Sequence, residues 1–67
     1  MTHDPIKSPQ RGDVLRHGKL TVTVLSVDRR VHYEVLKEGG KGLDAFPVQR
    51  IKPLAEWEKE VMGYEAL

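Results

Sequence analysis

The chain has 67 residues, no cysteine and a net charge of +1 at pH 7, and 31% of its residues are charged while 6% are aromatic. A chain of this length forms one domain at most and buries only about 60% of its unfolded surface, which leaves little room for a deep active site. The absence of cysteine excludes disulfide bonds and thiolate metal sites, and it is typical of proteins in a reducing cytoplasm.

The first ten residues are expected to form a disordered arm. They include Pro5 and Pro9 and offer only Ile6 as a large aliphatic side chain, so they cannot bury enough surface to offset the loss of chain entropy. They carry neither the basic nor the apolar region of a secretion signal, and no apolar run approaches the roughly 20 residues that cross a bilayer. We therefore expect a cytoplasmic protein with no membrane partner.

The strongest strand pattern runs from Leu20 to Val27, and the other strands are expected to pair around it. Leucine and valine alternate with threonine at the two-residue period of a strand. The apolar phase shifts at Leu25–Ser26, which predicts a β-bulge that curls the sheet. A first strand begins at Val14 and ends near Arg16, and the connection His17-Gly18-Lys19 predicts a tight antiparallel hairpin between the two strands.

The remaining strands are predicted from the alternation of apolar and polar residues, and their ends from glycine and proline. Three glycines between Glu38 and Gly42 indicate a loop, and proline ends strands because it cannot donate to a ladder. In chain order we expect a strand at Val31–Leu36, a short fourth strand at Leu43–Phe46, a single helical turn at Val48–Arg50 and a fifth strand at Ile51–Pro53.

From Pro53 onward the period of the apolar residues becomes helical. Leu54, Trp57, Val61 and Tyr64 lie at i, i+3, i+7 and i+10, which predicts a helix over 55–62 whose apolar stripe docks on an open end of the sheet. The expected core combines this stripe with the inward positions of the strands. Its members are Val14, Leu20, Val22, Val24, Val27, Val31, Tyr33, Val35, Leu43, Phe46, Val48, Ile51, Leu54 and Trp57.

The two parts of the chain differ in charge. Residues 1–54 hold ten Lys and Arg against six Asp and Glu, a balance of +4, whereas residues 55–67 hold one Lys against four Glu, a balance of −3. An acidic face on an exposed helix needs no functional explanation. The asymmetry nevertheless leaves open whether the tail lies across a basic surface or closes the core, and we favour closure of the core because burial of Trp57 outweighs exposed ion pairs.

Two stretches resemble the SH3-like barrel family. One is the hairpin opened by Gly12-Asp13-Val14, and the other is the series Gly42-Leu43, Phe46-Pro47-Val48 and Ile51. In that family a glycine-bearing turn leads into a strand ending in an aromatic–proline pair, then one helical turn, then the last strand. The resemblance implies a five-stranded antiparallel SH3-like barrel over residues 11–54, with a C-terminal α-helix and tail over 55–67. The short chain and its economical loops also resemble small proteins carried by prophages and other mobile elements.

The resemblance implies fold and leaves function open, because this barrel hosts peptide-binding, nucleic-acid-binding and enzymatic roles. No residue pattern indicates a catalytic group, a cofactor or a metal site, so we expect a non-enzymatic interaction module that binds a protein partner or a second copy of itself. Type II dihydrofolate reductase is a remote third alternative. Its Val-Gln-Ile-Tyr pore strand corresponds to Leu43–Phe46 here, where Asp44 replaces the amide and Phe46 the tyrosine.

Two groups of residues are candidate binding surfaces. The first is a cationic rim that would contact the phosphates of a nucleic acid, the alternative to protein binding. The second is a partner face of large side chains in the helix and tail, where tryptophan and tyrosine are typical of interfaces, although Trp57 is also expected to pack the helix onto the barrel. The cationic rim comprises Arg29, Arg30, His32, Lys37 and Lys41, and the partner face comprises Trp57, Met62 and Tyr64.

Overall fold

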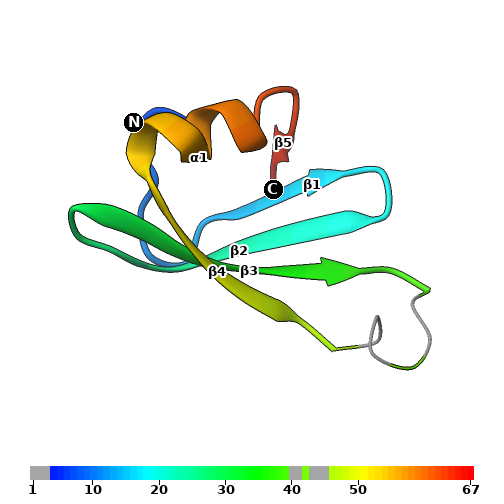
Figure 1. Cartoon of the computed structure of the whole chain (residues 1–67). Coiled ribbons are helices and arrows are strands. Elements are labelled where there is room, and N and C mark those ends of the chain that lie inside the picture. The colour runs from blue at the N-terminus through cyan, green and yellow to red at the C-terminus, as the bar shows by residue number, and fades with distance from the viewer. Residues whose placement is uncertain (1–3, 40–41, 43–45) are drawn as a thin grey trace.

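The computed structural model describes residues 4–39, 42 and 46–67, and it is mainly β, with five antiparallel strands and one short helix (Figure 1). The elements are β1 (Val14–His17), β2 (Leu20–Val27), β3 (Arg30–Lys37), β4 (Val48–Pro53), α1 (Leu54–Glu60) and β5 (Glu65–Ala66). The strands form one sheet in the order β4-β3-β2-β1-β5. Its two edges, β4 and β5, do not pair with each other, so the sheet is not closed into a barrel, although it is compatible with a small barrel fold.

Three local predictions are confirmed. β1 and β2 are antiparallel neighbours joined by a two-residue turn, in which Gly18 has a φ of 60° that favours glycine. β2 spans Leu20–Val27 as expected. The register between β2 and β3 shifts between Val24 and Ser26, which places the bulge at the predicted phase change.

The later strands differ from the prediction. Val48–Arg50, expected to form a helical turn, are instead part of β4, where they pair with residues 33–35 of β3. Val48, Arg50 and Lys52 alternate along one face of the strand, and the backbone of this segment forms ladder hydrogen bonds with β3 that a helical turn would not make. Of the predicted fourth strand at Leu43–Phe46, residues 43–45 lie outside the described residues, and Phe46 is in a bend. An unpredicted strand, β5, pairs Glu65 and Ala66 with β1.

Cross-strand register determines which side chains form the core. Leu15 lies opposite Val22, and Val22 lies opposite Val35, so these three share the inner face of the sheet. Leu15 is therefore buried whereas Val14, its neighbour and the expected core residue, is only half-buried. The fully buried core consists of Leu15, Val22, Val24, Val31, Tyr33, Trp57 and Val61.

Several expected core residues are exposed. Val27 and Leu54 are each 40% exposed, and Phe46, Val48 and Ile51 lie on or beside the edge strand β4 with exposures of 67%, 53% and 59%. Val48 is exposed because an edge strand has a neighbouring strand on one side alone. Ile51 is exposed because it lies opposite His32, on the face of the sheet away from the core. Leu43 lies outside the described residues.

Helix α1 packs on the inner face over β3 and β4. Trp57 is fully buried and meets Tyr33 edge to face, with the ring centroids 4.8 Å apart. The segment expected to be a disordered arm contributes to this packing, since Pro9 is buried, Ile6 packs against the core and the Pro5 carbonyl accepts a hydrogen bond from Trp57 Nε1 at 3.3 Å. In the part of the chain that the structure describes, no helix is long and apolar enough to cross a membrane.

Candidate functional site

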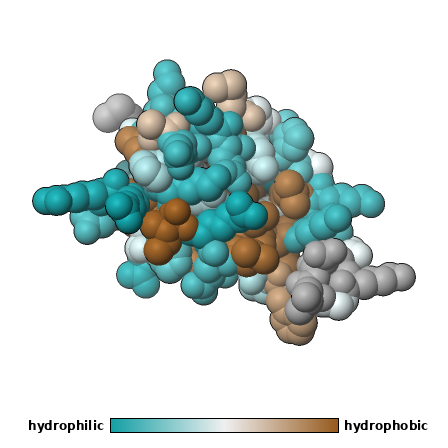
Figure 2. Space-filling model, in the orientation of Figure 1, coloured by the Kyte–Doolittle hydropathy of each residue, from teal (hydrophilic) through white to brown (hydrophobic). Residues whose placement is uncertain are grey.

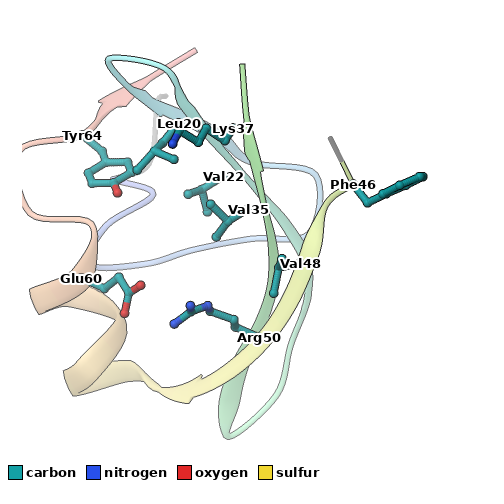
Figure 3. A pocket seen from close by; sticks show the side chains of 9 residues that line it. All are labelled: Leu20, Val22, Val35, Lys37, Phe46, Val48, Arg50, Glu60 and Tyr64. Atoms are coloured by element: carbon teal, nitrogen blue, oxygen red, sulfur yellow. The ribbon is translucent and has the colours of Figure 1, made fainter. Parts of the chain in front are cut away.

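An apolar groove lies on the inner face of the sheet, in the space between β4 and the segment that follows α1. Its volume is about 260 Å³. Figure 2 shows hydrophobic residues in separate patches below the helix, with hydrophilic residues between and around them. The lining residues are Leu20, Val22, Val35, Lys37, Phe46, Val48, Arg50, Glu60 and Tyr64 (Figure 3).

The floor of the groove continues the hydrophobic core. Val22, Val35 and Val48 are directly opposite one another on β2, β3 and β4, in one row across the sheet. Along this row Val22 is 1% exposed, Val35 is half-buried and Val48 is 53% exposed. Helix α1 covers the neighbouring row at Tyr33 and ends at Glu60, so the valine row emerges from the core into the groove.

The charged residues of the groove are mostly cationic. Figure 3 shows Arg50 on β4 and Glu60 on α1 reaching toward the same space, with Lys37 at the far end of β3. Lys52 donates a hydrogen bond to Glu60 Oε2, and this ion pair neutralises the one acidic side chain among the lining residues that the structure describes. Within the described residues, neither Lys37 nor Arg50 has a carboxylate within 4.0 Å. The groove therefore presents two positive charges beside an apolar floor.

A polar cluster lies where the groove meets the core. Tyr33 is fully buried, and its hydroxyl has no hydrogen-bond partner among the described residues. Burial, followed by the nearby negative charge of Glu60, raises the pKa of Tyr33 above 10.0. The hydrogen bond to Glu60 likewise raises the pKa of Lys52 above 10.5. Both raised pKa values mean that the folded chain holds the protons of Tyr33 and Lys52 more tightly.

The predicted cationic rim is not brought together. Arg29 and Arg30 are exposed at the turn between β2 and β3, while Lys37 ends β3 at the other end of the strand. Seven residue steps at about 3.3 Å each separate Arg30 from Lys37 by roughly 23 Å. His32 is half-buried between these two ends, and Lys41 lies outside the described residues. Among the described members of this group, Lys37 alone lines the groove.

The predicted partner face is also divided. Trp57 lies in the core, where it packs the helix onto the sheet, so its side chain does not contribute to an exposed surface. Met62 is 73% exposed. Tyr64 is half-buried, stacks on His17 with the ring centroids 5.0 Å apart, and forms one wall of the groove. Of the three residues, Tyr64 is the one that the structure places at the candidate site.

In the described part of the chain, no three or more His, Cys, Asp or Glu side chains form a group that could hold a metal ion. The comparison with type II dihydrofolate reductase concerns residues 43–46, and residues 43–45 lie outside the described residues.

Sequence reasoning missed Arg50 and Glu60 as site residues. The sequence analysis predicts a helical turn at Arg50, although the alternation Val48-x-Arg50-x-Lys52 is itself a strand pattern that puts Arg50 on the same face as Val48. Glu60 belongs to the helix and meets Lys52 only because α1 folds back over β4. No spacing rule relates two residues brought together in this way.

No protein-family model, curated protein or solved structure matches the chain. Function is therefore inferred from the groove. An apolar floor with cationic side chains at its margin can bind apolar groups that carry negative charge nearby.

Proposed function

We propose that this protein is a non-enzymatic interaction module whose groove binds apolar side chains of a partner protein. The observation that carries the proposal is the valine row, which runs from the buried Val22 through the half-buried Val35 to Val48, whose side chain is 53% exposed in the groove. Contiguous apolar surface rimmed by polar residues is one of the features by which interaction sites are recognised, although the patches of established sites are larger than this one. The floor is continuous with the core, so it is held rigidly before any partner arrives.

The size of the groove favours peptide side chains over a free small molecule. Its volume of about 260 Å³ is below the roughly 300–1,000 Å³ of typical small-molecule sites. One or two side chains of a polypeptide would fill it, with the remaining contacts made along the rim. The order of the last elements, in which α1 lies between β4 and β5, supports an SH3-like arrangement whose helical element is at Leu54–Glu60, not at the expected Val48–Arg50.

The proposal is tested with two matched variants of β4. Val48 lines the groove, whereas Ile51 lies opposite His32 on the other face, and the two are similarly exposed at 53% and 59%. A library of displayed random peptides is selected on the wild-type protein, and each enriched peptide is titrated against Val48→Asp and Ile51→Asp. Because an aspartate at position 48 puts a charge on the apolar floor, we expect it to weaken binding by at least about tenfold. Ile51→Asp should leave affinity within about threefold.

Sedimentation velocity supplies the second measurement. A dimer that dissociates in Val48→Asp and persists in Ile51→Asp would identify a second copy of the chain as the groove's partner. Peptides that bind both variants as tightly as the wild type would contradict the proposal. So would a protein that is monomeric and on which the selection enriches no peptide.

A further inference from the structure

The outer edge of β4 borders the groove and is open. β4 pairs with β3 on one side, and on its other side no described residue forms a backbone hydrogen bond with it. A strand directs its N–H and C=O groups to both sides, so an edge strand presents a row of unpaired groups that can template another strand. The same edge carries Val48 and Arg50, which line the groove. A strand added here would place its inward side chains in the groove.

The side chains of β4 are not those of an edge built only to face water. Protected edges carry charge or proline: β4 carries Arg50 and Lys52, and Pro47 and Pro53 limit the available stretch to residues 48–52. Within and beside that stretch, however, Phe46, Val48 and Ile51 are all more than half exposed. Apolar side chains therefore face outward on both surfaces of the strand, where an added neighbour would cover them.

Charge determines the kind of neighbour. β4 contains Arg50 and Lys52 and no acidic residue, and Lys52 is already paired with Glu60. Pairing β4 with β4 of a second copy would bring these cations close to their counterparts, and like charges across a strand pair are destabilising. A segment with a carboxylate opposite Arg50 would instead form a charge-assisted hydrogen bond. Lys37 adds a second positive charge at the groove.

We propose that an extended segment of a partner protein adds to β4 as an additional strand, with an acidic residue opposite Arg50 and an apolar residue opposite Val48. The two positions are two residues apart and share the inner face of the sheet. In antiparallel pairing the partner reads acidic-x-apolar from its N-terminus. This inference rests on the proposed function, and it specifies how the partner's chain and charge meet the groove.

The test uses the full chain and a synthetic peptide, acetyl-Thr-Val-Glu-Thr-Val-Thr-amide, in which the glutamate and the second valine are two residues apart. Affinity is measured by calorimetry or by chemical-shift titration. Two further peptides carry N-methyl groups on alternate residues in opposite phases, so that one loses the N–H groups on one edge and the other loses those on the opposite edge. Strand addition requires one phase to weaken binding by at least about tenfold and the other to leave it nearly unchanged.

Charge exchange provides a control that does not depend on the backbone. Arg50 is exposed, so Arg50→Glu is expected to fold. This variant should bind the glutamate peptide about tenfold or more weakly than the wild type does. It should bind the peptide in which lysine replaces the glutamate more tightly than the wild type does. Lys59→Glu, an exposed cation on α1 outside the groove, is the matched control and should change neither affinity by more than about twofold.

The outcomes separate this inference from the proposed function. If both N-methylated peptides bind like the parent, side chains enter the groove without a ladder, which overturns strand addition and leaves the proposed function intact. If the glutamate and lysine peptides bind the wild type equally, the assigned acidic position is wrong. If the synthetic peptide does not bind while Val48-dependent peptides are found by selection, strand addition is overturned; if neither experiment yields a ligand, both proposals fail.

Discussion

Replacement of Trp57 by alanine tests whether α1 is held by burial or by charge. Trp57 is 0% exposed, contacts Tyr33 edge to face and donates a hydrogen bond to the Pro5 carbonyl. Truncation of a buried Trp or Phe costs about 3–5 kcal/mol. At roughly 0.05–0.15 kcal/mol per residue, the free energy of unfolding of this chain is about 3–10 kcal/mol. Trp57→Ala should therefore remove between a third and all of its stability.

Urea unfolding followed by far-UV circular dichroism measures the effect, because Trp57 is the sole tryptophan and the variant lacks tryptophan fluorescence. With a denaturant slope of about 1 kcal/mol per molar urea, the midpoint should fall by roughly 3 M or the chain should be unfolded in buffer. The control reverses the charge of Glu56 and Glu58 to lysine. Exposed ion pairs contribute about 0–1 kcal/mol, so this control should move the midpoint by less than about 1 M. An unchanged midpoint in Trp57→Ala, with a large shift in the charge-reversed control, would refute burial as the force that holds the helix.

Three further predictions follow from register, protonation and backbone geometry. Leu15→Ala should cost about 2–5 kcal/mol in urea unfolding and Val14→Ala less than half of that, since only Leu15 is fully buried; equal losses would contradict the observed register. Tyr33 and Lys52 bind their protons more tightly in the folded chain, so the stability they contribute is complete below pH 10 and is lost as the pH rises through their raised pKa values. Melting temperature should thus fall from about pH 10 upward, and a constant value to about pH 12 would exclude this linkage. Gly63→Ala should lower stability by about 1 kcal/mol in thermal melts because Gly63 has a φ of 89°, and a neutral result would show that this turn adapts.

The local sequence pattern was sufficient to predict those features that depend on residues close together in the chain. The alternation of β2, the glycine turn after β1 and the phase shift at Leu25 are properties of consecutive residues, and all three are present. The docking of Trp57 also followed from sequence, because a large aromatic side chain at helical spacing gains most by burial.

Cross-strand pairing decided the features that local pattern left open. The inward side of β1 is set by the pairing of Leu15 with Val22, and a shift of one residue would have put Val14 in the core instead. The two-residue strand β5 is too short to show an alternation, and it exists because the chain returns to β1 after α1. Neither fact can be read from neighbouring residues in the chain.

The sequence alone determined a small, mainly β domain with a central strand at Leu20–Val27 and a C-terminal helix anchored by Trp57, because periodicity and turn residues act within a few positions of one another. The tertiary structure alone decided that Val48–Pro53 is an open edge, and that Arg50 and Glu60 line one groove beside a row of valines that emerges from the core. These features depend on which strands become neighbours and on where the helix stops covering the sheet. Both are set by long-range packing of side chains that lie far apart in the chain.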